Sequence, residues 1–351
     1  MTSDAPADLA TFPRRARTIV DLAKLAGVSP STISRALADK SVVKATTVAR
    51  IKALAREHDF RLNQMASGLR TRRTGVIGVV VPLGHERRQH LSDPFFLTML
   101  GHFADALTEN GYDMMISRII PDAPDWLERI VDSGKLDGVL VLGHSNQVEA
   151  IERVARQYAP MVVWGSAAEA QTHCCVGTDN RLGGYIAGQH LISVGARRIA
   201  FFGDLRAPEL RHRFDGLSQA MTEAGFIEPP LVLETHLAVD VMGREIADHL
   251  DRYGERIDGV FAGSDVIALT TLRALADRGV AVPDKVKVIG FDDLPLAMQA
   301  VPRITTIRQD FQTGARAMID RLFLKIEGKP VSSVTMAPRL IVRDSTATSV
   351  R

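Results

Sequence analysis

The sequence is poor in cysteine and contains no long apolar run. Its two cysteines, Cys174 and Cys175, are adjacent, and neighbours in sequence rarely form a disulfide, which fits a reducing compartment. Apolar stretches such as 76–83 and 139–142 are far too short to span a bilayer. Residues 1–17 lack an apolar stretch followed by a small-residue cleavage site. We therefore expect a cytoplasmic protein with no membrane partner.

Common motifs of catalysis and cofactor binding are also missing. The sequence has no G-x-S-x-G elbow and no Walker lysine. The glycine-rich "RLGGYIAG" (181–188) does not follow a strand in G-x-G-x-x-G form, so we expect it to open a helix that packs closely on a sheet. The run "HCC" (173–175) matches no standard zinc spacing and has no second ligand pair nearby in sequence. We predict no catalytic residues, no metal and no cofactor, and therefore no enzyme.

Positive charge is concentrated in one short segment. Residues 14–73 hold 14 lysines and arginines against 4 acidic residues, whereas the whole chain of 351 residues has a net charge of +2. The rest of the chain is therefore acidic. A basic head on an acidic body suggests a polyanion as the partner of the head, the alternative being a solubilising surface. The length suggests two or three folded units.

The basic segment begins with the pattern of two short helices joined by a turn. Apolar residues recur at helical spacing over 19–26 and again over 30–38. Thr18 stands where an N-cap belongs, Gly27 can supply the turn, and Ser29 is the N-cap candidate of the second helix. This arrangement predicts a helix-turn-helix.

The second helix carries short hydroxyl side chains and one guanidinium. Its expected polar face consists of Ser31, Thr32, Ser34 and Arg35. In a helix-turn-helix the second helix lies in the DNA major groove, where hydroxyls reach phosphates or base edges and an arginine can clamp guanine. A solvated helix in an unrelated three-helix unit is the alternative. We expect a third helix, capped by Thr46 or Thr47.

Three motifs in this order extend the pattern: "TIVDLAKLAGVSPSTISRAL", "LNQMASGLRTRRT" and "GVIGVVVP". Together they resemble the headpiece and hinge of the LacI-type (lactose-repressor) family of bacterial transcription regulators. The resemblance implies a flexible tail (1–17), a helix-turn-helix domain (18–63), a hinge (64–73) that becomes helical on DNA, and a core (74–345). A plain flexible linker is the alternative for the hinge. The DNA-binding residues implied by the resemblance are Thr18, Pro30, Ser31, Thr32, Ser34, Arg35, Asn63, Ala66 and Leu69.

Two of these residues have specific implied roles. Pro30 occupies one of the family's main base-reading positions, together with Ser31 and Arg35, but it can make only apolar contacts. Leu69 matches the leucine that enters the minor groove and kinks the duplex. Because Pro30 departs from the larger side chains often found there, the operator sequence does not follow from the resemblance.

After Thr74 apolar, β-branched runs alternate with helical patterns. Such alternation predicts parallel sheets covered by helices on both faces. The predicted strands are 75–81, 113–117, 138–143, 161–165, 198–203, 259–264 and 286–292. Their number suits two α/β lobes with a cleft at the carboxyl ends of the strands, and the resemblance implies the same two-lobed, periplasmic-binding-protein-like core. We expect one lobe at about 75–178 and 310–337, and the other at about 179–309 and 338–345.

Side chains at the carboxyl ends of the predicted strands are the candidates for an effector site. They are Phe95, Phe96, His144, Trp164, Arg213, Ser264 and Asp292. Arg213 and Asp292 match effector-contacting residues of the family, and an arginine with an aspartate suits vicinal hydroxyls of a sugar. The aromatic residues can stack on a sugar ring or fill the core.

These observations lead to one hypothesis with two alternatives. We expect a repressor of carbohydrate-utilisation genes that binds double-stranded, palindromic operator DNA as a homodimer and responds to a small-molecule effector, a saccharide or glycoside. The alternatives are a sugar-binding protein in which the head is incidental, and a DNA-binding protein that responds to no ligand. The C-terminal "IVRDSTATSVR" has no leucine repeat of the kind that a tetramerising tail needs, which favours a dimer.

Overall fold

The chain divides into two compact units, a small helical unit within residues 1–74 and an α/β unit within residues 75–351. The computed structural model describes residues 18–37, 43–60, 73–166 and 171–347. The predicted tail (1–17) and nearly all of the predicted hinge (64–73) lie outside these ranges. No helix within them is long and apolar enough to cross a membrane.

The first unit is the predicted helix-turn-helix followed by a third helix. Its helices are α1 (Ile19–Ala26), α2 (Pro30–Leu37) and α3 (Ala45–Glu57). Thr18 caps α1, since its Oγ1 accepts from the backbone N–H of Asp21 at 3.2 Å. Ser29 caps α2 by accepting from the backbone N–H of Thr32 at 3.2 Å. Gly27 has a φ of 63°, a left-handed conformation that glycine adopts without strain. The three predicted turn and cap residues are thus confirmed.

The third helix begins earlier than the sequence pattern indicated. Lys44 is its N-cap and makes no side-chain capping hydrogen bond, so Thr46 and Thr47 lie inside the first turn. The prediction that one of these threonines caps the helix is wrong, because the backbone becomes helical directly after Lys44. The three helices share a small core, formed by Leu22, Ala23, Ala26, Ile33, Ala36, Ile51 and Ala55.

Over its described residues, the second unit contains two six-stranded sheets. The first has the strand order β11-β5-β4-β3-β1-β2, and the second has the order β12-β10-β9-β8-β6-β7. All pairings are parallel except that of β10 with β12. The strands of the first sheet are β1 (Val76–Pro82), β2 (Asp113–Ile119), β3 (Gly138–Leu142), β4 (Met161–Trp164), β5 (Cys174–Thr178) and β11 (Val334–Met336). Those of the second are β6 (Ile199–Phe202), β7 (Leu231–Leu233), β8 (Gly259–Ala262), β9 (Lys287–Asp292), β10 (Thr305–Arg308) and β12 (Arg339–Ile341).

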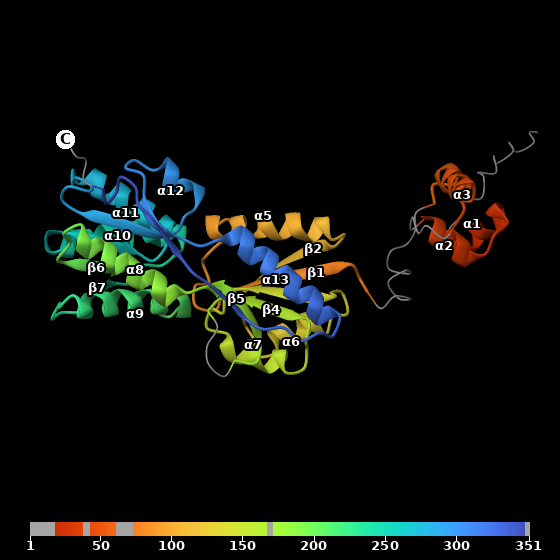
Figure 1. The fold of residues 1–351 in the computed structure, drawn as a ribbon, viewed down its shortest axis with the longest axis horizontal. Helices are drawn as coiled ribbons and strands as arrows, with labels where there is room; N and C mark the ends of the chain where they lie inside the picture. Colours follow the sequence, from red (N-terminus) through yellow and green to blue (C-terminus); the bar gives the residue numbers. More distant parts are fainter. Residues whose placement is uncertain (1–17, 38–42, 61–72, 167–170, 348–351) are drawn as a thin grey trace, which may run out of the picture. The chain divides into compact units, whose positions relative to one another are not determined.

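Helices cover both faces of each sheet, as Figure 1 shows. The helices are α5 (Pro94–Glu109), α6 (Trp126–Val131), α7 (Val148–Ala155), α8 (Asn180–Ser193), α9 (Pro208–Glu223), α10 (Val239–Tyr253), α11 (Asp265–Asp277), α12 (Pro295–Gln299) and α13 (Phe311–Ile326). The first lobe contains the first sheet, with α5 and α13 packed on one face and α6 and α7 on the other. In the second lobe α8 and α9 pack on one face and α10 and α11 on the other. The two-lobed α/β fold predicted from the sequence is confirmed.

The chain passes between the lobes three times: after β5, after β10 and after β11. Each lobe is therefore built from segments that are distant in sequence. The strands converge with their carboxyl ends toward the space between the lobes, which is where parallel sheets usually bind ligands.

Candidate functional site

Helix α2 presents a narrow polar face. Pro30, Ser31 and Arg35 are exposed, and Thr32 is half-buried. The Ser29 hydroxyl lies 2.8 Å from that of Ser31 and 2.9 Å from that of Thr32, so the first turn displays a cluster of hydroxyls. Arg35 lies one turn further along the same helix. Short side chains followed by an exposed guanidinium let a helix approach the floor of a groove closely.

Ser34 does not belong to this face. Its side chain is 8% exposed and lies on the buried side of α2. Because α2 packs against both α1 and α3, its buried arc is wide and takes in Ser34 as well as Ile33 and Ala36. The prediction that Ser34 faces outward is therefore wrong. Asn63, Ala66 and Leu69, the predicted hinge contacts, lie outside the described residues.

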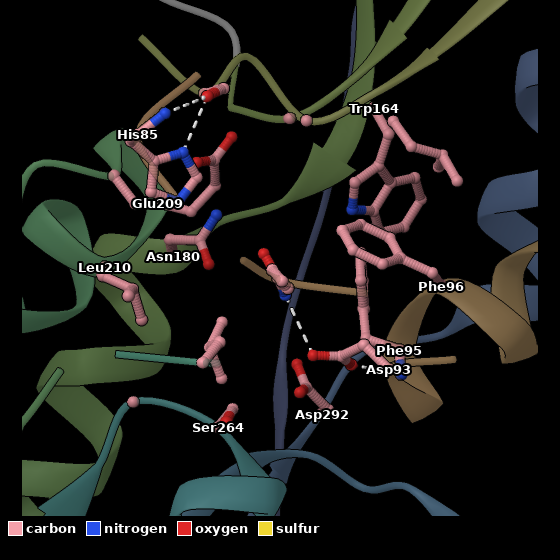
Figure 2. Close-up of a pocket in the computed structure, with 18 of the residues that line it drawn as sticks. His85, Asp93, Phe95, Phe96, Trp164, Asn180, Glu209, Leu210, Ser264 and Asp292 are labelled. Atoms are coloured by element: carbon pink, nitrogen blue, oxygen red, sulfur yellow. Dashed lines mark hydrogen bonds between the residues drawn. The ribbon is translucent and has the colours of Figure 1, made fainter. Parts of the chain in front are cut away.

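A cavity lies between the two lobes of the α/β unit. It encloses about 850 Å³ of atom-free space, including the solvent at its mouth. Six of the seven predicted effector-site residues line it: Phe95, Phe96, Trp164, Arg213, Ser264 and Asp292. Figure 2 shows aromatic side chains on one wall, with Glu209 and Asn180 on the other.

Arg213 is held from several sides in the cavity wall. It projects from α9 and is 7% exposed. Its Nε donates to Asn180 Oδ1 at 2.8 Å, and its Nη1 donates to the carbonyl of Gly263 at 2.5 Å. The guanidinium lies 3.6 Å from the centre of the Phe291 ring. These contacts fix a planar, charged donor group at the cavity surface.

Asp292 ends β9 and faces Arg213. Its Oδ1 lies 4.0 Å from Arg213 Nη2 and accepts from Gln309 Nε2 at 2.7 Å. Burial raises the pKa of Asp292 to about 7, although the charge of Arg213 acts in the opposite direction. The residue has a φ of 120°, an unusual conformation for a non-glycine residue and one that is typical of functional positions. The pair places donors and an acceptor side by side.

The other cavity wall belongs to the first lobe. Phe95 and Phe96 open α5, and Trp164 ends β4. The Phe95 ring lies edge-on to that of Phe96, with centroids 5.4 Å apart, and both Phe95 and Trp164 also contact Phe311. All three side chains line the cavity and are buried or half-buried. They therefore pack in the hydrophobic core and also form part of the cavity wall.

His144 is the predicted effector residue that does not line the cavity. It is 2% exposed and lies behind the wall, where its Nδ1 is 3.4 Å from Glu209 Oε1. Glu209, at the start of α9, lines the cavity in place of His144. Although burial acts to raise its pKa, the hydrogen bond from His144 lowers the pKa of Glu209 to about 2. The direct role predicted for His144 is therefore wrong, because its ring turns away from the cavity.

The cavity also contains polar residues that were not predicted from the sequence. Asp93 caps α5, accepts from Gln89 Nε2 at 2.9 Å, and has a pKa raised by burial. Asn180 and Gln309 follow β5 and β10 and hold Arg213 and Asp292, respectively. Both positions lie within two residues of the end of strands that the hydrophobic pattern did not reveal. Asp93 lies in the "SDPFF" stretch that supplied Phe95 and Phe96, and the signal available for it was its N-cap position before proline.

Both units of the chain are similar to known protein families. Residues 18–63 match the family described as bacterial regulatory proteins, lacI family, and residues 189–346 match a periplasmic binding protein-like domain. The HTH-type transcriptional regulator MalR of Streptomyces coelicolor is 30% identical over 351 residues, which cover 94% of this chain and 97% of that protein.

Solved structures agree in fold. The transcriptional regulator CelR in complex with cellobiose is 27% identical, with a TM-score of 0.69, over 94% of this chain and 100% of that one. The lac repressor dimer bound to operator and the anti-inducer ONPF has a TM-score of 0.81 at 21% identity, over 94% of this chain and 99% of that one. With a lacI-family headpiece and similarity to such a regulator along nearly its whole length, the chain belongs to the LacI family of bacterial, DNA-binding transcriptional regulators.

Proposed function

We propose that this regulator is a repressor of carbohydrate-utilisation genes that is controlled by a neutral saccharide or glycoside in the cavity between its lobes. The observation that carries the proposal is the pairing of Arg213 with Asp292 opposite an aromatic wall. A sugar hydroxyl both donates and accepts, so adjacent hydroxyls suit a guanidinium beside a carboxylate. Aromatic side chains suit the apolar face of a sugar ring.

The charge around the cavity favours a neutral ligand. Asp93, Glu209 and Asp292 line it, whereas Arg213 is the one lysine or arginine side chain among the described residues that do so. A phosphate group would bring about two negative charges into this acidic site, where like charges repel one another. The buried hydroxyl of Thr178 also lines the cavity and has no hydrogen-bond partner within the described protein.

We further propose that the headpiece binds one half of a palindromic operator and that two copies of the chain bind the whole. One helix-turn-helix reads only a half-site, so a palindrome requires a twofold-symmetric dimer. The exposed Pro30, Ser31 and Arg35 are the proposed base-reading residues, and the hydroxyls of Ser29 and Thr32 are the proposed phosphate contacts. Effector binding between the lobes would favour one dimer arrangement over another, and so couple the two sites.

Thermal unfolding of the full chain with a ligand panel tests the effector class. We expect a neutral mono- or disaccharide, at 100 times its dissociation constant, to stabilise the chain by about 2.7 kcal/mol. The matched control is the phosphate ester of the same sugar, which has the same ring and an added charge, and which we expect to be without effect. Stabilisation by the phosphate ester or by a purine, without stabilisation by any neutral sugar, would contradict the proposed class.

Replacing Arg35 tests the DNA-reading surface. Against a site selected from random duplex DNA, we expect Arg35→Ala to weaken specific binding by about 1–3 kcal/mol, because a bidentate contact to a base is lost. The matched control is Arg56→Ala on α3, an exposed arginine whose Nε bonds the Lys52 carbonyl of its own helix. Its loss should weaken specific and non-specific binding alike. Equal effects of the two variants on specificity would exclude Arg35 from base reading.

A further inference from the structure

A second polar cluster lies behind the cavity wall, inside the first lobe. It contains His144, from the loop after β3, His173, which directly precedes β5, and Cys175, at the start of β5. The Nε2 atoms of the two histidines are 3.0 Å apart, and Cys175 Sγ is 3.6 Å from His144 Nε2. The three atoms lie within 4.8 Å of one another, and all three residues are buried. The cluster is therefore a convergence of ligand-type atoms in the protein interior.

Each histidine is oriented by a carboxylate on its other ring nitrogen. Nδ1 of His173 bonds Oε1 of Glu152, and Nδ1 of His144 bonds Oε1 of Glu209 at 3.4 Å. Glu152 is itself held by the backbone N–H of Thr172 at 3.0 Å. Carboxylates in this position fix the tautomer and the ring orientation of metal-binding histidines. The cluster thus has the outer layer of partners that metal sites use.

The two carboxylates determine where the imidazole protons lie. A carboxylate accepts, so each Nδ1 carries its proton and each Nε2 of a neutral ring carries a lone pair. Two lone pairs then face each other at 3.0 Å. Beside them lies one weak donor, the Cys175 thiol, whose sulfur is also 3.5 Å from Gln171 Oε1. Such a set of acceptors around a common point is suited to a cation.

The distances suit a tetrahedral ion. Zinc lies about 2.0–2.1 Å from a histidine nitrogen and about 2.3 Å from a cysteine sulfur, so tetrahedral ligands are separated by about 3.4 Å (N to N) and about 3.6 Å (N to S). The observed separations from His144 Nε2 are 3.0 Å to His173 Nε2 and 3.6 Å to Cys175 Sγ, and no two of the three atoms are more than 4.8 Å apart, so modest side-chain shifts admit the ion. Gly165 supplies the room for the His144 ring: a Cβ there would lie 2.5 Å from the ring.

We propose that His144, His173 and Cys175 bind one borderline-soft divalent transition-metal ion of the zinc class. The ion bonds the two Nε2 atoms and the cysteine sulfur, and the thiol proton leaves to solvent as the metal–sulfur bond forms. The expectation of no metal rested on the spacing of "HCC" and on the lack of a second ligand pair nearby in sequence, whereas the fold brings in His144 from 29 residues upstream of His173. Because Glu209 bonds His144 and lines the effector cavity, the site lies one side chain away from that cavity.

Cobalt(II) binding to the untagged, chelator-treated full chain tests this site. We expect one equivalent to bind, with a thiolate-to-cobalt charge-transfer band and the strong visible bands of tetrahedral coordination. Cys175→Ser should abolish the charge-transfer band. The matched control is Cys174→Ser: Cys174 is also buried and free, but its Sγ bonds the Ser332 carbonyl on the other side of the strand, so the band should persist. A missing band in the wild type, or a band that Cys175→Ser leaves intact, would overturn the proposal.

A positioning variant separates a metal site from a set of packed polar side chains. We expect Glu152→Gln to weaken cobalt binding about 10–100-fold while leaving one site per chain, because His173 loses the carboxylate that orients it. Circular dichroism of the Glu152→Gln and Cys175→Ser variants reports whether the fold is intact. An unchanged cobalt affinity in a folded Glu152→Gln variant would contradict the assigned geometry.

Discussion

We expect Arg213→Met to lower the free energy of unfolding of the α/β unit by about 3–5 kcal/mol at pH 8. Methionine preserves much of the length of the side chain and its contact with Phe291, but it removes the charge opposite Asp292. The carbonyls of Asn180 and Gly263 also lose their donors in a buried site. Removing one partner of a buried pair is strongly destabilising because the other charge stays buried without compensation.

The loss should depend on pH, and its sign follows from the raised pKa of Asp292. The folded-state pKa of about 7 exceeds the unfolded value near 3.8. The stability associated with the neutral carboxyl is therefore fully present below the unfolded pKa and is lost as the pH rises through about 7. Without Arg213 the folded-state pKa rises further, so the variant continues to lose stability above pH 7. We expect a smaller deficit at pH 6 than at pH 8.

Urea unfolding at pH 6 and pH 8 measures both effects. The chain's two tryptophans, Trp126 and Trp164, are buried in the α/β unit, so their fluorescence reports its transition. The double variant Arg213→Met/Asp292→Asn should recover a large part of the loss at pH 8. As a surface control, Arg273→Met breaks an exposed pair with Asp277 and should have an effect below about 1 kcal/mol. Equal losses at the two pH values would show that Asp292 is not the group left unpaired.

The fold was predictable where hydrophobic patterning was strong. The seven predicted strands are present. Six of them are continuous apolar runs buried on both faces, as in β1 and β9, whereas β2 is an edge strand whose residues are exposed or half-buried. The strands β7, β11 and β12 have three residues each and are partly exposed, so they leave little pattern. β5 was missed because its sequence, "CCVGT", is short and includes a glycine, although all five residues are buried.

The candidate site was predictable only as far as strand ends could be located. Six residues placed from the sequence line the cavity, whereas Asn180 and Gln309 follow strands that the pattern did not reveal. The roles of His144 and Ser34 depend on which way a side chain turns. Ser34 turns inward because two helices pack on α2, and His144 turns back over Gly165 toward His173. Residue type and spacing alone do not determine such choices.

We expect Gly216→Ala to destabilise the α/β unit by about 3 kcal/mol or more, because it would force apart two helices whose backbones touch. A Cβ on Gly216, in α9, would lie 1.9 Å from the carbonyl oxygen of Arg181 and 2.6 Å from the amide nitrogen of Tyr185 in α8. The contact is reciprocal, since a Cβ on Gly184 would lie 1.9 Å from the carbonyl oxygen of Arg213. Backbone atoms cannot rotate away, so a whole helix must shift.

The same urea experiment, with Gly243→Ala as the matched control, tests this prediction. Gly243 lies inside α10, and a Cβ there would meet no atom within 4 Å. We expect that variant to be neutral or to gain about 0.5–1 kcal/mol, since alanine favours a helix over glycine. If Gly216→Ala had the same effect on stability as Gly243→Ala, the result would contradict a close backbone contact between α8 and α9 at Gly216. Because α9 also carries Arg213, a shift of this helix should weaken ligand binding in the cavity along with stability. The glycines of "RLGGYIAG" do not line the cavity, but Gly184 helps to set the position of α9 and therefore of Arg213.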